Sequence, residues 1–284
     1  MDRDVTIRFY EVVNSSNHGP ALETVLAAIY AARPRDRESD APEVRLRLEM
    51  LREEDGVLLG DVTRVQTENL PGHVTDETTD ALPVHEIGHW VAFCYDPATR
   101  VIAIQFDQKM SIGRVLAYFS EFGGASAFSY YPVLTQDALE RFRNQRPTKI
   151  TLQMARVRNF RDVRQQTTDF ETQIENMGEL FDGPTVEISI STRGADRQLD
   201  GAQTWNTIRR WLGFREETTG VNKILAKTIE SEEPFNFIKE LLKSSSTLNL
   251  PNNDPARNRQ IRIEHVKECY DEYRGYLRGI LAAA

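Results

Sequence analysis

Residues 90–106 read WVAFCYDPATRVIAIQF, the clearest secondary-structure pattern in the chain. Two runs of aromatic and β-branched residues, 90–95 and 101–106, flank the segment Asp96-Pro97-Ala98-Thr99-Arg100. Asp-Pro suits the first two positions of a type I turn, because proline fixes the backbone angle that the second position requires. The pattern therefore predicts an antiparallel β-hairpin and an extended backbone around residue 90.

The sharpest chemical motif of the chain, His85-Glu86-Ile87-Gly88-His89, lies directly before this hairpin. On a helix, histidines four residues apart share a face and hold zinc, while the glutamate between them polarises a water molecule. Catalytic zinc needs a third protein ligand. The extended form of the motif would place glycine at 92 and histidine at 95, where this chain has Ala92 and Tyr95.

An extended backbone would separate the two imidazoles by about 13 Å, which is too far to hold one ion. We therefore expect no metal or other cofactor and no catalytic residue at this motif, and we expect a protein that is not an enzyme. The alternative is a zinc peptidase with Glu86 as the general base and His85 and His89 as metal ligands.

Alternating apolar residues before the hairpin predict further strands at 5–13, 44–51 and 57–67. Apolar residues at helical spacing predict helices at 21–32 and 111–122. The first part of the chain should therefore be rich in antiparallel strands.

The later part mixes strand and helix patterns. Strands are predicted at 127–134, 149–157 and 185–192, and helices at 136–144, 160–180 and 202–213. Residues 244–246 and 250–255 have the composition of a linker, and a long amphipathic helix is predicted at 261–281. The fold class is α+β, with a strand-rich antiparallel N-terminal part, then mixed strands and helices, and a long C-terminal helix.

Charge divides the 284-residue chain, whose formal net charge is −8. Residues 1–140 contain 12 Lys/Arg and 23 Asp/Glu, and residues 141–284 contain 23 and 20, so the two parts carry −11 and +3. We expect an acidic β-rich module at 1–125 and a module at 126–284 with a basic patch and a helical C-terminus. Two distant cysteines, no long apolar run and a polar N-terminus indicate a cytoplasmic protein.

Residues 141–164 form a concentrated basic stretch in which only Asp162 is acidic. Its eight cations are Arg141, Arg143, Arg146, Lys149, Arg156, Arg158, Arg161 and Arg164. Such a surface contacts phosphates without reading bases, so we predict that these residues bind nucleic acid, with DNA as first choice, or an acidic protein. The competing interpretation is that they pair with the acidic half of the chain or are simply solvated.

The order of elements resembles that of the RexA/KwaB-like phage-exclusion proteins over residues 44–281. The resemblance rests on the hairpin 89–106, the helix 111–122, the segment Tyr131-Pro132-Val133-Leu134, the strands 149–157 and 186–191, and the final helix. It implies a non-enzymatic DNA-binding sensor for antiviral defence that acts with a partner, often a membrane protein.

The predicted function is thus a cytoplasmic antiphage-defence or prophage-encoded sensor that contacts nucleic acid or an acidic partner through the basic patch. Two alternatives remain. One is the zinc metallopeptidase described above. The other is an oligomeric interaction module in which the C-terminal helix pairs with a second copy across a two-fold axis.

Overall fold

The structure is a computed structural model that describes residues 2–16, 19–39, 45–74, 79–81, 84–124, 126–155, 185–192, 197–217, 221–231, 233–251 and 254–282. The chain forms two compact units. The first comprises Met1–Arg8, Val12–Phe128 and Ser244–Ala284, and the second comprises Phe9–Glu11 and Ser129–Lys243. Each unit contains an antiparallel sheet with helices, so the predicted α+β class is confirmed.

The first unit is built on a sheet with the strand order β13-β1-β7-β6-β3-β2. Its elements are β1 (Asp2–Asn14), α1 (Leu22–Ala31), the 3-10 helix η1 (Pro34–Arg37), β2 (Arg45–Glu54), β3 (Val57–Gln66), β4 (Gly72–Val74), β5 (Thr79–Ala81), β6 (Ile87–Asp96), β7 (Val101–Gln105), α2 (Ile112–Phe122), β13 (Lys243–Asn249) and α6 (Pro255–Ala282). The predicted hairpin is confirmed, because β6 and β7 pair from Phe93 with Ile104 to Asp96 with Val101.

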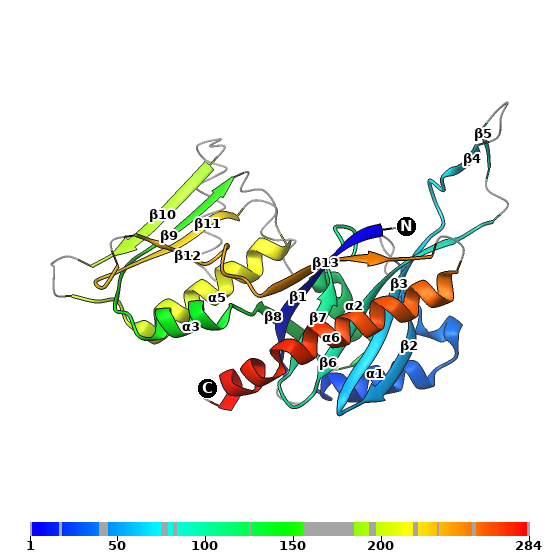
Figure 1. Cartoon of the computed structure of the whole chain (residues 1–284), viewed down its shortest axis with the longest axis horizontal. Helices are drawn as coiled ribbons and strands as arrows, with labels where there is room; N and C mark the ends of the chain where they lie inside the picture. The colour runs from blue at the N-terminus through cyan, green and yellow to red at the C-terminus, as the bar shows by residue number, and fades with distance from the viewer. Residues whose placement is uncertain are drawn as a thin grey trace. The chain divides into compact units, whose positions relative to one another are not determined.

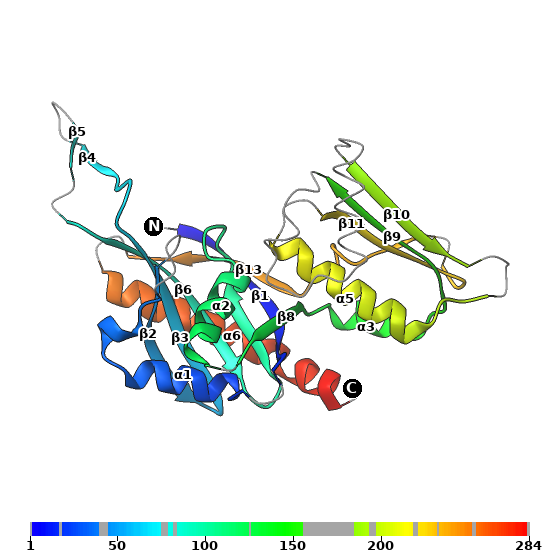
Figure 2. The ribbon, with the colours of Figure 1, turned by 180° about the vertical axis from the view of Figure 1, so that it is seen from behind.

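Helices cover both faces of this sheet. Figures 1 and 2 show α6 on one face and α1 with α2 on the other. From β6, Phe93 packs against Phe119 of α2, and on the opposite face Asp96 accepts a hydrogen bond of 2.5 Å from Tyr270 of α6. Because β6 is buried on both faces, residues 91–96 form a continuous buried run instead of alternating with exposed residues.

The C-terminal helix belongs to the first unit, which corrects the expectation that it closes the second module. Its apolar stripe is buried, and the buried residues are Ile263, Val266, Cys269, Tyr270 and Leu277. A long amphipathic helix must bury this stripe, and the open face of the first sheet provides the surface. The stripe proposed for pairing with a second copy is therefore covered within the chain. No helix in the described part of the chain has the length and apolar character of a membrane span.

Residues 244–246, expected in a linker, lie in the edge strand β13. Ser246 Oγ lies 2.6 Å from His265 Nε2, which joins β13 to α6. Serine-rich composition concealed the strand, because alternate residues of β13 are only half-buried and the edge position needs no apolar side chains.

Two carboxylates are buried between the sheet and α6, Asp61 of β3 and Asp96 of β6, and neither side chain is exposed. Arg259 Nε lies 2.7 Å from Asp61 Oδ2, an ion pair without the alignment of a hydrogen bond. Burial raises the pKa of Asp61 to about 6, although the Arg259 charge opposes this shift. A carboxylate in this position makes the packing of α6 sensitive to pH.

The second unit is built on a sheet with the strand order β10-β9-β11-β12. Its elements are β8 (Phe128–Pro132), α3 (Gln136–Arg143), β9 (Pro147–Ala155), β10 (Thr185–Ser191), α5 (Gly201–Glu217), β11 (Val221–Thr228) and β12 (Phe235–Asn236). In Figures 1 and 2, α3 and α5 lie together on one face of the sheet. The buried core between them contains Phe142, Ile150, Leu152, Trp211 and Ile224. The helix predicted at 160–180 lies outside the described residues.

Gly60 of β3 is enclosed by its neighbours, and we expect Gly60→Ala to destabilise the first unit by about 1–3 kcal/mol. An added Cβ would lie 2.6 Å from the Met50 carbonyl oxygen and 2.6 Å from the Phe93 ring. Neither group can move without disturbing strand pairing or the core. Urea unfolding measures the effect, with the uncrowded Gly275→Ala on α6 as control. Equal stability of both variants would contradict the close packing.

Candidate nucleic-acid interface

The structure separates the predicted basic residues. Arg141 and Arg143 are exposed in the last turn of α3, Arg146 lies between α3 and β9, and Lys149 is exposed on β9. The remaining four, Arg156, Arg158, Arg161 and Arg164, lie outside the described residues.

The cations of α3 and Lys149 lie on opposite sides of the sheet. Phe142 of α3 packs in the same buried core as Ile150 of β9. Because successive strand residues point to opposite faces, Lys149 points away from that core and from α3. The guanidinium of Arg141 lies 5.2 Å from the centre of the Phe235 ring. The described members of the basic stretch therefore do not form one continuous surface.

Arg146 is already engaged by a carboxylate. Its backbone N–H donates to Glu230 Oε2 at 2.8 Å, and its Nε donates to Oε1 at 2.7 Å. The side-chain and backbone hydrogen bonds from Arg146 lower the pKa of Glu230. For this residue, the interpretation as internal pairing fits the structure.

The sheet face opposite α3 and α5 presents a set of lysines and hydroxyl groups, here called the outer sheet face. Lys149 stands between Ser191 of β10 and Lys227 of β11. Two rows along the sheet, Lys223 stands opposite Gln153. Within the described ranges, no carboxylate forms an ion pair with any of the three lysines that define this face, Lys149, Lys223 and Lys227.

The row between the lysines consists of Ser189, Thr151 and Leu225, and the Thr151 side chain is buried. Thr151 Oγ1 and Ser189 Oγ lie 2.9 Å apart across β9 and β10. Glu187 pairs with Gln153 and adds a carboxylate to this face. Lysine and hydroxyl groups are the side chains that contact phosphate oxygens in nucleic-acid complexes.

Lys223 and Lys227 were missed because β11 was not predicted from the sequence. The segment VNKILAKT carried the signal, since Ile224, Ala226 and Thr228 are buried and Lys223 and Lys227 are exposed. This alternation with period two is typical of a half-buried strand.

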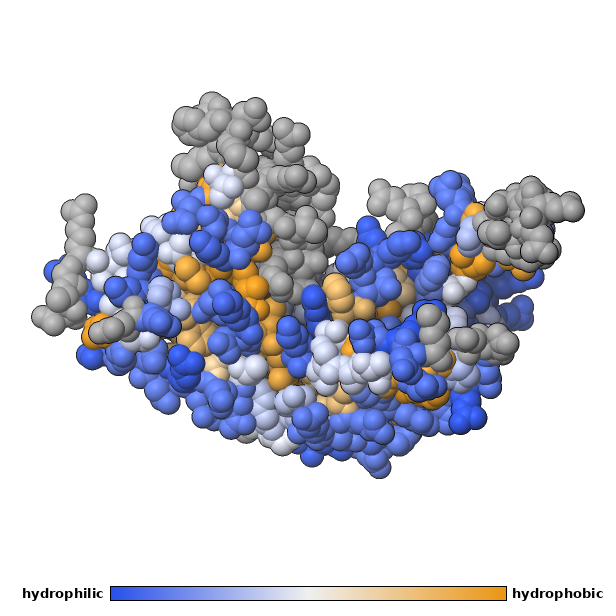
Figure 3. All heavy atoms as spheres, turned by 45° about the horizontal axis from the view of Figure 1, so that its top comes forward, coloured by the Kyte–Doolittle hydropathy of each residue, from blue (hydrophilic) through white to orange (hydrophobic). Residues whose placement is uncertain are grey.

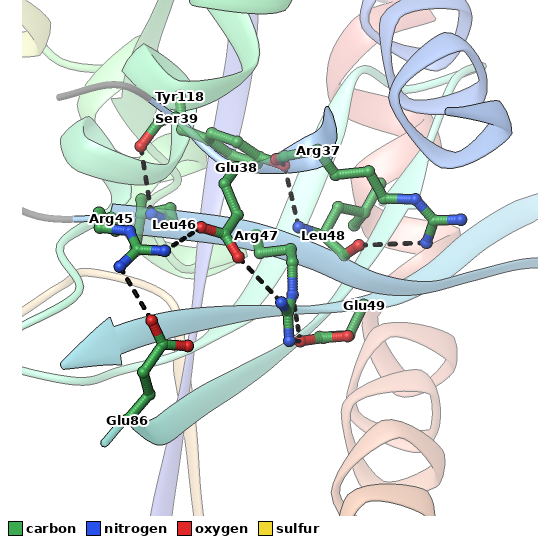
Figure 4. Close-up of polar contacts among 10 residues, drawn as sticks. All are labelled: Arg37, Glu38, Ser39, Arg45, Leu46, Arg47, Leu48, Glu49, Glu86 and Tyr118. Carbon is green, nitrogen blue, oxygen red and sulfur yellow. Dashed lines mark hydrogen bonds and ion pairs between the residues drawn. The ribbon is translucent and has the colours of Figure 1, made fainter. Parts of the chain in front are cut away.

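The HExxH motif lies in a bend and a strand, with no helix. His85 is exposed in the bend, and His89 pairs with Arg64 within the β3–β6 ladder. Glu86 Oε1 accepts a bond of 3.1 Å from Arg45. Figure 4 shows Arg45 also bonded to Glu38, which bridges to Arg47. The helix that the zinc-peptidase alternative requires is therefore replaced by β6.

Burial, followed by the charges of Arg64 and Lys109, lowers the pKa of His89, which favours the neutral imidazole at pH 7. Across the described ranges, no three His, Cys, Asp or Glu side chains gather as a metal-ligand group.

The face drawn in Figure 3 is mainly hydrophilic over its described part. Across the described surface, the exposed large apolar side chains are scattered along the chain, at Tyr30, Val84, Phe106, Ile190 and Ile229.

No known family model matches this sequence, and no curated protein matches it significantly.

Proposed function

We propose that this protein binds nucleic acid through the outer sheet face of the second unit, without catalysing a reaction on it. The observation that supports this proposal is the pair Lys149 and Lys227, which face each other on adjacent strands. Like charges directly opposite each other destabilise a sheet. A phosphate between the two ammonium groups would convert this repulsion into two attractions.

The biological setting proposed for this binding is a cytoplasmic sensor in antiphage defence, as the resemblance to phage-exclusion proteins implies. Sensing requires that the nucleic acid be bound and kept intact, which a face of lysine and hydroxyl groups can do. A membrane-protein partner belongs to the same proposal.

Reversing two charges tests the interface. We expect Lys149→Glu with Lys227→Glu to weaken DNA binding at least tenfold, and the slope of log K against log salt to fall by about two. Fluorescence anisotropy with labelled single-stranded and double-stranded DNA at several salt concentrations measures both quantities. The control is Lys239→Glu, on an exposed turn of the same unit. It makes the same change of charge as each single substitution of the double variant, and it should have little effect on DNA binding.

Binding that is unchanged in the double variant would remove the outer sheet face from the proposal. If only the fourfold reversal of Arg156, Arg158, Arg161 and Arg164 to glutamate abolishes binding, the site lies on those residues instead. Failure to bind either form of DNA, and failure to bind RNA in the same assay, would leave an acidic protein as the partner class.

A further inference from the structure

A pocket of 470 Å³ lies in the first unit, where several distant segments of the chain meet. It is lined by the start of β1, the start of β6, the segment after β7, the segment after β13 and the first turns of α6. The residues that matter chemically are Arg3, His89, Trp90, Phe106, Asp107 and Arg262. Small-molecule sites typically have volumes in this range.

A second pocket of 360 Å³ adjoins the first, because both are lined by His89, Phe106 and Asp107. It adds two cations, Arg64 and Lys109. The two pockets together are here called the strand-end pocket.

Positive charge exceeds negative charge in the strand-end pocket. Its cations are Arg3, Arg64, Lys109 and Arg262, and none of them forms an ion pair with a carboxylate of the described chain. Its two carboxylates are already hydrogen-bonded. Asp4 accepts from Thr247 Oγ1 at 2.7 Å, and Asp107 accepts from the backbone N–H groups of Lys109 and Met110 at 2.7 and 3.0 Å.

The cations are held together against mutual repulsion. Burial and the Arg3 charge lower the pKa of Arg262, and only Asp107 opposes this effect. Arg64 and Lys109 act in the same direction on His89. Cations that are kept close together in a concave site, despite their mutual repulsion, indicate a ligand of negative charge.

Buried polar atoms in the pocket wall also lack partners. Trp90 Nε1 and Arg262 Nε are buried N–H groups without a hydrogen-bond acceptor in the described part of the chain. The helix α6 begins beside them at Pro255, and Asp254 Oδ1 caps it by accepting from the Arg257 N–H at 2.9 Å. Because that N-terminus already has its own carboxylate cap, the unpaired buried donors are the feature that favours an anion in the pocket.

Aromatic rings narrow the class of anion. Phe106 is 39% exposed, and the Arg8 guanidinium lies 3.6 Å from its ring centre. Trp90 lines the same pocket, where its ring is half-buried and the Arg259 guanidinium lies 5.5 Å from its centre. An exposed ring beside cations favours a ligand that joins a phosphate to a planar base, because bases stack on aromatic faces.

We propose that the strand-end pocket binds a nucleotide through its terminal phosphate, with Arg3 and Arg262 holding the phosphate and Phe106 and Trp90 contacting the base. The ligand is either a free nucleotide or the phosphorylated end of a strand. The site lies in the first unit and uses none of the lysines of the outer sheet face.

Isothermal titration calorimetry on the full chain tests the proposal. The probes are the four nucleoside 5′-monophosphates, a 5′-phosphorylated tetranucleotide, its 5′-hydroxyl form, adenosine and inorganic phosphate. We expect a phosphate-bearing nucleotide to bind at least about tenfold more tightly than adenosine or inorganic phosphate. Adenosine lacks the charge-assisted hydrogen bonds to the phosphate, and inorganic phosphate lacks the contacts of the base with the aromatic rings. Binding of the tetranucleotide alone would identify a strand end as the ligand.

Arg3→Gln and Arg262→Gln should each weaken this binding at least about tenfold. Arg262→Gln should also leave the melting temperature unchanged or raise it, because it removes a repelled charge. Arg257→Gln is the matched control, an exposed arginine on the same helix that does not line the pocket.

Three results would overturn the proposal. The first is that no phosphate-bearing nucleotide binds. The second is that Arg3→Gln and Arg262→Gln bind the nucleotide as tightly as the wild type does. The third is that inorganic phosphate binds as tightly as the nucleotide. The Lys149→Glu/Lys227→Glu variant should keep this binding, which separates the strand-end pocket from the nucleic-acid interface.

Discussion

Replacing Arg259 with methionine is expected to lower the unfolding free energy of the first unit by about 3–5 kcal/mol at pH 8. Asp61 has no exposed side-chain surface, and Arg259 is the cation that lies against it. Without that cation, an ionised carboxylate remains buried between β3 and α6 with no compensating charge. Urea unfolding at fixed pH measures the loss.

The cost of Arg259→Met should depend on pH. Burial raises the pKa of Asp61 from 3.8 to about 6, so the folded state binds a proton more tightly than the unfolded chain. In the wild type, the contribution of Asp61 therefore makes stability fall by about 3 kcal/mol as pH rises from about 4 to about 6, and stay constant above. Loss of the Arg259 charge raises the pKa of Asp61 further, so the free energy of unfolding continues to fall to a higher pH.

Arg259→Met should consequently cost little at pH 5 and most of its full amount at pH 8. Asp61→Asn removes the ionisable group and should flatten the pH dependence of stability in both backgrounds. The double variant should be more stable at pH 8 than Arg259→Met alone. A pH-independent loss on Arg259→Met would show that its packing, and not its charge, stabilises α6.

Replacing Trp211 with alanine is expected to destabilise the second unit by about 3–5 kcal/mol. Trp211 of α5 is fully buried in the core between the helices and the sheet. No neighbouring side chain can fill the volume of an indole, so a cavity remains. Hydrogen–deuterium exchange measured by mass spectrometry should show faster exchange in β9 and β11.

Exchange in β3 and β6 of the first unit should change little in Trp211→Ala, because the two units have separate cores. Trp205→Ala is the comparison, since the Trp205 ring is only partly buried at the edge of the same core. Equal losses for the two variants, or faster exchange throughout the chain, would contradict this division.

Local patterns made much of the first unit predictable. The hairpin of β6 and β7 was predictable because aromatic and β-branched runs flank a turn whose sequence suits only a reversal of direction. The same hairpin pattern predicted an extended backbone, and not a helix, at the end of the HExxH motif. The helix predicted at 111–122 begins one residue later, because Ser111 caps α2: its side chain accepts a hydrogen bond from the Arg114 N–H at 3.4 Å.

The candidate interface was predictable only in part. A charge count located the basic stretch, but it could not show that α3 and Lys149 lie on opposite sides of one sheet. That separation depends on which face of β9 the helices cover, and the covering residue Trp211 lies far along the chain. Lys227 joined Lys149 only through the pairing of β11 with β9.

The α+β class and the extended backbone around residue 90 could be predicted from the sequence, because both depend on periodicity and turn residues within short segments. The packing of α6 on the first sheet and the existence of the strand-end pocket could be learned only from the three-dimensional structure. Such features depend on contacts between distant residues, as between Asp4 and Thr247, and no local pattern encodes which of several apolar faces will pair.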